Sequence, residues 1–144
     1  MLKRFFAVLF GALLFLGSFC GCGGPSDEEV IADLGEKFMV AMYAGNDAMA
    51  KEICNATGYE TYVAMRDLIS LASLGLMDML AEGQNLEEMV YAKVNTVRVK
   101  KLSETRGVAV VLDTIGDEPA EYSIPVEKDA DGEWKVAVTK AAFN

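Results

Sequence analysis

The spacing of apolar residues changes once along this chain, and that change limits the fold more than any other feature. From Val30 to about residue 81, apolar side chains recur at helical spacing, whereas from Met89 onward they occupy every second position. A helix buries one stripe and a strand buries one face, so helices followed by strands must bury these surfaces against each other. The sequence therefore predicts an α+β roll, with N-terminal helices packed on a curved four-stranded antiparallel sheet.

Local signals define the first two helices. Ser26 followed by three acids predicts a hydroxyl cap and a helix over 27–44, and Gly45 offers the left-handed residue that ends it. Asn46 can cap a second, shorter helix over 47–54. We expect these two helices to pack as a corner.

The third helix, predicted over 60–81, is apolar nearly all round between Leu68 and Leu80. Our main interpretation is a helix buried between the sheet and the first helix. A dimer interface or a pocket for a lipid-like ligand remains an alternative, because exposed apolar patches usually contact something.

Four strands are predicted from Met89 onward. The second is nearly all apolar and should be central, and Pro125 predicts an unpaired stretch or a bulge in the third. A one-residue shift in the alternation of apolar and polar residues near Asn95 predicts a bulge in the first strand. The expected ranges are 89–99, 108–115, 121–127 and 133–139.

The N-terminus has the order of an export signal. Lys3 and Arg4 precede an apolar run over 5–16, and small residues follow up to Cys22. The residues that end at Cys22 resemble the lipobox of bacterial lipoproteins, in which the cysteine is lipidated and becomes the new N-terminus. We therefore expect residues 1–21 to be a signal peptide and Cys22 to be the lipidation site.

This interpretation sets the domains and the location. Residues 22–26 are a short linker, and 27–144 form one α+β roll domain. Its partner through the N-terminal lipid is the membrane, so we expect an extracytoplasmic protein of the cell envelope. Gly23 rather than Asp after the lipidated residue favours the outer membrane if the organism is Gram-negative.

Charge excludes one class of partner. The leader removes two of 13 cations, which leaves 11 against 22 acids and a net charge of −11. Nucleic acid is not an expected partner, because phosphate binding requires clustered Lys and Arg. Lys93, Arg98, Lys100 and Lys101 form a local basic patch, which is either an interaction surface or charge that protects an edge strand.

No cofactor or metal is predicted. The chain has no histidine, and with Cys20 in the leader and Cys22 lipidated, Cys54 remains as a small buried residue in a helix. Glu127, Asp129, Asp131 and Gly132 resemble the opening of a calcium loop. The final ligand position is a valine, so we expect a hairpin turn.

The helix over 27–44, its ending Gly45-Asn46-Asp47, and the strand Asp131-Gly132-Glu133-Trp134-Lys135-Val136 carry a resemblance. They look like small bacterial lipoprotein domains of unknown function with a nuclear-transport-factor-two-like, cystatin-like fold. The resemblance covers nearly all of the mature chain. It implies a superfamily that includes ketosteroid isomerases, polyketide cyclases and scytalone dehydratases, whose conical cavity holds acid-base residues.

Glu121, Glu127 and Glu133 fall on outward strand positions, and we expect no catalytic residues. The tyrosines and Trp134 either line a cavity mouth or join the core. Tyr122 and Trp134 fall on the alternate strand positions that face the core. We predict a non-enzymatic envelope protein that binds a small apolar ligand or a partner protein, at unknown residues. The alternatives are a cavity enzyme of the isomerase or dehydratase type, and a structural protein that self-associates through Leu68–Leu80.

Overall fold

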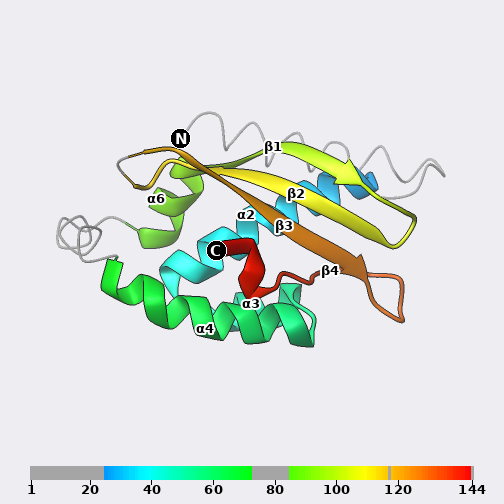
Figure 1. The fold of residues 1–144 in the computed structure, drawn as a ribbon, viewed down its shortest axis with the longest axis horizontal. Helices are drawn as coiled ribbons and strands as arrows, with labels where there is room; N and C mark the ends of the chain where they lie inside the picture. Colours follow the sequence, from blue (N-terminus) through cyan, green and yellow to red (C-terminus); the bar gives the residue numbers. More distant parts are fainter. Residues whose placement is uncertain (1–24, 73–84, 117, 144) are drawn as a thin grey trace.

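The computed structural model describes residues 25–72, 85–116 and 118–143, and confirms the predicted α+β class (Figure 1). Four described helices precede a four-stranded antiparallel sheet, and a short 3-10 helix follows it. No helix in the described ranges is long and apolar enough to cross a membrane. The elements are α2 (Asp27–Ala44), α3 (Asp47–Ile53), α4 (Ala56–Ala72), α6 (Leu86–Lys93), β1 (Val94–Lys101), β2 (Arg106–Asp113), β3 (Ala120–Lys128), β4 (Trp134–Val136) and η2 (Lys140–Phe143).

Helix α2 has the predicted bounds, and both end signals act as expected. The Ser26 hydroxyl accepts a hydrogen bond from the backbone N–H of Glu29 at 3.3 Å. Gly45 ends the helix in the left-handed conformation, with φ of 67°. The Asn46 side chain then accepts from the N–H of Met49 at 3.1 Å and caps α3.

The strands are ordered β1-β2-β3-β4, so the apolar β2 is central, as predicted. The β1 register shifts between Thr96 and Arg98, which confirms the bulge. Pro125 keeps its place opposite Val108 in the β2–β3 ladder, without a register shift. The β3–β4 ladder ends at Val126, and beyond it the Pro125 carbonyl accepts from the Ala137 N–H at 2.8 Å, so Pro125 lacks only the bond that its missing N–H would have donated.

The prediction that the first strand begins at Met89 is wrong. Residues Leu86–Lys93 form α6, and β1 begins at Val94. The side chain of Asn85 accepts from the N–H groups of the two acids that follow Leu86, which caps this helix. Val90 is buried but Ala92 is exposed, so the apparent alternation of the two did not mark one face of a strand.

Helix α4 begins four residues earlier than predicted. The Asn55 side chain accepts from the N–H of Gly58 at 2.8 Å, and the helix starts at Ala56. Its described part ends at Ala72, and the rest of the predicted third helix, 73–81, lies outside the described residues.

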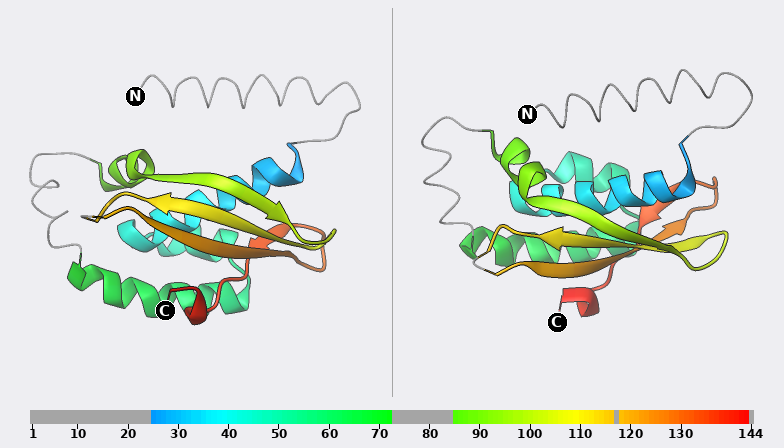
Figure 2. Two further views of the ribbon diagram at one scale, coloured as in Figure 1. Left: turned by 45° about the horizontal axis from the view of Figure 1, so that its top comes forward. Right: turned by 90° about the horizontal axis from the view of Figure 1, so that it is seen from above.

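The core surrounds α2, which packs on β1 and β2 on one side and contacts α3, α4 and α6 on the others (Figure 2). Ile31, Phe38 and Met39 of α2 are fully buried against β2 and β3 residues such as Val111 and Ile124. The concave face of the sheet is therefore filled by the side chains of its own helix.

The domain has two ends. At the entry end, where α2 begins, Asp27 accepts a hydrogen bond from the Trp134 indole N–H at 3.1 Å and pairs with Lys101 at 3.0 Å. The turns after β1 and β3 lie at the same end (Figure 1). At the far end, the last residues of α2 meet the end of β2, where Tyr43 contacts Asp113.

Candidate functional site

Two predicted sites lie wholly or largely outside the described residues. Cys22 is one, and the side chains from residue 69 to Leu80 are the other. Leu68, the first residue of the apolar run, is 64% exposed on α4. Thr61 and Tyr62 of α4 are buried, but the predicted position between the sheet and the first helix is wrong for the described part of α4, because α2 packs directly on β1 and β2 and α4 contacts α2 and α3.

A buried carboxylate at the far end is the strongest chemical feature of the described residues, and the sequence analysis missed it. Asp113 is only 4% exposed. It is the last residue of β2 and shares the inward face with Ala109 and Val111. The sequence carries no local signal for this inward position, because the residues from Gly107 to Leu112 include no polar side chain that would distinguish the two faces of β2.

Both carboxylate oxygens of Asp113 have donors from the fold. The Tyr43 hydroxyl donates to Oδ2, and the backbone N–H of Ile115 donates to Oδ1 at 2.8 Å. Burial, and then the hydrogen bond to Asp113, raise the pKa of Tyr43 well above its ordinary value. The phenol therefore stays a donor, and the pair fastens α2 to β2.

Aromatic rings lie near this end of the core. Phe143 of η2 stacks on Phe38 of α2 at 6.3 Å and meets Tyr122 of β3 at 5.4 Å, measured between ring centroids. Tyr122 is half-buried and Trp134 is buried, as their strand parity predicted. These side chains are part of the core rather than a separate ligand surface.

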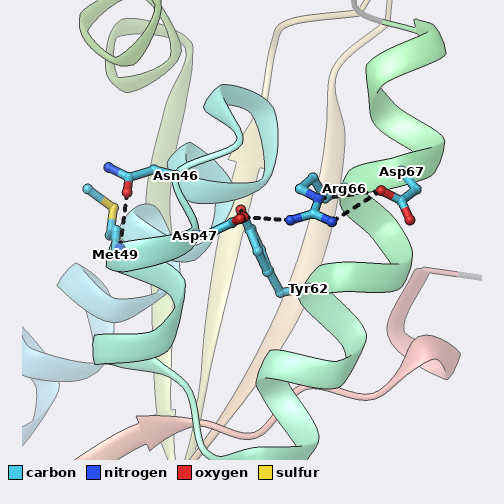
Figure 3. A network of polar contacts seen from close by, with 6 residues as sticks. All are labelled: Asn46, Asp47, Met49, Tyr62, Arg66 and Asp67. Carbon is cyan, nitrogen blue, oxygen red and sulfur yellow. Dashed lines mark hydrogen bonds and ion pairs between the residues drawn. The ribbon is translucent and has the colours of Figure 1, made fainter.

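A second polar network holds α3 against α4. Figure 3 shows Asp47 of α3 facing Tyr62 and Arg66 of α4. The Tyr62 hydroxyl and the Arg66 guanidinium both donate to Asp47 Oδ1 at 2.6 Å. The bond from Tyr62, and then that from Arg66, lower the pKa of Asp47, while burial and the bond to Asp47 raise the pKa of Tyr62. The network orients α4, from which Leu68 projects.

The calcium-like motif forms the hairpin turn that the sequence predicts. Asp129 Oδ1 accepts from the N–H groups of Asp131 and Glu133, both at 2.9 Å, and Gly132 has a φ of 79°. Asp129, the second carboxylate of the motif, thus stabilises the turn. Within residues 25–72, 85–116 and 118–143, no three potential ligand side chains come together for a metal ion.

Cys54 is buried at the end of α3, as predicted, and burial raises the pKa of its thiol to about 12. A thiol with that pKa is almost fully protonated at neutral pH and reacts slowly. Cys54 is therefore a core residue rather than a nucleophile.

The structure divides the predicted basic patch between two elements. Lys93 ends α6, whereas Arg98, Lys100 and Lys101 lie on β1. Arg98 pairs with Glu121 of β3 at 3.0 Å across the sheet. The three acids expected on outward positions of β3 and β4 also lie at the surface, Glu127 partly buried by its neighbours.

Comparison with known proteins matched no protein family, no curated protein and no solved structure.

Proposed function

We propose that this chain is a lipid-anchored, non-enzymatic protein of the cell envelope that binds a partner protein through α4. The observation that carries the binding role is the 64% exposure of Leu68, where the apolar run of the sequence begins. A small apolar ligand on the concave side of the sheet has less support, since α2 fills that side in the described residues.

The sequence of the leader supports the anchor. A basic start, an apolar segment and a small residue before Cys22 are the three parts of a lipoprotein signal. Only residues 23–26 separate Cys22 from α2, whose cap at Ser26 opens the folded domain. The confirmed α+β class is compatible with the proposed membership of the nuclear-transport-factor-two-like lipoprotein domains.

Metabolic labelling tests the anchor. We expect radiolabelled palmitate to enter the wild-type chain in its producing cells and not the Cys22→Ala variant. Cys54→Ala is the matched control, because a buried thiol should play no part in labelling. Equal labelling of wild type and Cys22→Ala would reject the anchor.

Native mass spectrometry of the chain extracted from its own membranes tests the binding role. A partner should remain bound to the wild type and be lost from Leu68→Glu. Leu102→Glu, on β1's side of the molecule, is the control, because Leu102 is 65% exposed and so matches Leu68. A mass of two identical chains would instead favour self-association through Leu68–Leu80.

The buried Asp113 favours a second candidate, a cavity enzyme with an acid-base carboxylate. Against it, both oxygens already accept hydrogen bonds within the fold. A catalytic base must be reachable by substrate. If reagents that modify carboxyl groups label Asp113 in the folded protein, the enzyme interpretation gains over the binding one.

A further inference from the structure

Strand β1 differs in charge from the rest of the chain. Residues 93–101 contain four cations and no acid, although the whole chain has a net charge of −9. The strand is at the edge of the sheet, so one of its sides faces no other strand. Lys100 is exposed, and the described part of the chain records no ion pair for it, whereas Arg98 pairs with Glu121 at the surface.

Apolar side chains are exposed beside these cations. Val97, at the bulge, is 40% exposed, and Leu102, directly after the strand, is 65% exposed. Edge-strand charge that prevents strand pairing explains Lys100 but not two exposed apolar residues next to it. Cations interleaved with exposed apolar groups fit the boundary of a bilayer, where the apolar groups enter the headgroup layer and the cations meet phosphates.

The position of α2 brings this edge to the membrane if Cys22 carries lipid. Asp27, the first residue of α2, pairs with Lys101 at the end of β1 at 3.0 Å, so chain entry and β1 meet (Figures 1 and 2). The four residues 23–26 reach about 14 Å when extended. An 18-residue helix such as α2 is about 27 Å long. The linker is therefore too short to invert the domain and place its far end on the membrane.

Resting on the proposed anchor, we propose that β1 and Leu102 form a membrane-docking edge for anionic lipid headgroups. Val97 and Leu102 enter the headgroup layer, and Lys100, with Lys93 and Arg98 on either side of Val97, binds lipid phosphates. Glu104, two residues after Leu102, is exposed and pairs with Lys101 at 3.5 Å, so Lys100 is the cation on which the attraction to the headgroups mainly depends. Leu68, on the opposite side of α2 from β1, then faces away from the bilayer.

Fluorescence quenching in vesicles tests the docking edge. The lipidated chain is prepared as Leu102→Cys or, as the matched control, Leu68→Cys, and labelled with an environment-sensitive thiol probe. The buried Cys54, with its pKa raised to about 12, should not take up the label at neutral pH. The chain is reconstituted in phosphatidylcholine vesicles with or without phosphatidylglycerol, together with a quencher on the lipid headgroup.

We expect strong quenching at Leu102→Cys in anionic vesicles and little at Leu68→Cys. Adding Lys100→Ala should lower the ratio of docked to undocked chains about fivefold, the effect of one cation near an anionic surface. Equal quenching at the two positions, or quenching that does not depend on phosphatidylglycerol, would overturn the docking edge. The anchor proposal would still stand in that case if the chain incorporated palmitate. Cross-links between Leu102→Cys copies would overturn the docking edge in favour of a protein interface, and absence of lipid would overturn both proposals.

Discussion

At the scale of single residues, the interior depends on hydrogen bonds that tyrosines give to carboxylates. Tyr43 donates to Asp113 between α2 and β2, and Tyr62 donates to Asp47 between α4 and α3. Each bond joins two elements that are distant in sequence or packed at an angle. Substitution of the donor alone is the direct test of each.

Tyr43→Phe should reduce the free energy of unfolding by about 1 to 3 kcal/mol, because it leaves Asp113 Oδ2 without a donor at a buried site. Urea unfolding followed by circular dichroism measures this change. Tyr59→Phe is the control, since the described residues record no hydrogen bond for the Tyr59 hydroxyl. A loss no larger than that of the control would show that Asp113 has another source of stabilisation.

Alkaline pH should destabilise the fold through Tyr62. Its pKa in the fold is raised above the ordinary 10.0, first by burial and then by the bond to Asp47, so the folded state holds the proton more tightly than the unfolded state. The stabilisation is complete below about pH 10 and is lost progressively above it, by up to about 1.4 kcal/mol per pH unit. The pKa of Tyr43 is also raised in the fold, so its ionisation destabilises the folded state at alkaline pH in the same way.

Urea unfolding between about pH 9 and about pH 11 measures this dependence. Tyr62→Phe should show a shallower fall in the free energy of unfolding than the wild type over that interval, because the variant lacks one of the tyrosines whose pKa is raised by folding. An identical slope would mean that Tyr62 ionises in the fold as it does in the unfolded chain.

The sequence predicted that the acids expected on β3 and β4 are exposed to solvent, but it did not predict the buried position of Asp113. Glu121 and Glu133 alternate with apolar neighbours, so their parity placed them outside. Asp113 stands at the end of a strand without alternation, and its donor Tyr43 is 70 residues away. No local pattern connects two such residues, because their contact exists only once α2 lies on β2.

At the scale of elements, the fit between α2 and β2 depends on Gly35. A Cβ at this position would lie 2.6 Å from the Ala109 Cβ and 3.0 Å from a Val111 methyl group. Alanine improves helix propensity by up to about 1 kcal/mol, but overpacking here should cost about 1 to 3 kcal/mol. We therefore expect Gly35→Ala to be destabilised in urea unfolding.

Gly116→Ala is the matched control for that substitution. Among the described residues, its Cβ would meet only the Glu118 carbonyl oxygen, at 3.9 Å, so the change should be tolerated. Equal stability of Gly35→Ala and the wild type would mean that α2 can move away from β2 without loss of packing.

The sequence predicted elements well where both ends carry local signals. Ser26 and Gly45 gave the bounds of α2, and the slip in apolar spacing gave the β1 bulge. Helix α6 was missed because eight residues are too few to establish a period, and its cap at Asn85 was not recognised. The start of α4 was misplaced because the Asn55 cap was taken for part of a turn.

At the scale of the whole molecule, the first helix and the last strand are directly linked. The chain's single tryptophan, Trp134 of β4, donates to Asp27 at the start of α2. Its fluorescence therefore reports on the entry end, while far-ultraviolet circular dichroism reports mainly on the helices.

We expect residues 22–144, with Cys22→Ser, to unfold in urea in one transition, with the same midpoint by both signals, because a single core spans Ile31 to Val138. Asp27→Asn is the control that weakens the link to Lys101; it should shift both midpoints together. A fluorescence transition that precedes the loss of helical signal would divide the domain into separate folding units.

The bond between Asp27 and Trp134 also has a consequence for biosynthesis, since its two residues are 107 positions apart. The ribosome releases α2 long before the strands on which it packs, so the nascent chain lacks the sheet that completes the burial of this helix until most of the polypeptide has been synthesised. Under the proposed export, a sheet that forms last favours a polypeptide that is still unfolded when it crosses the membrane.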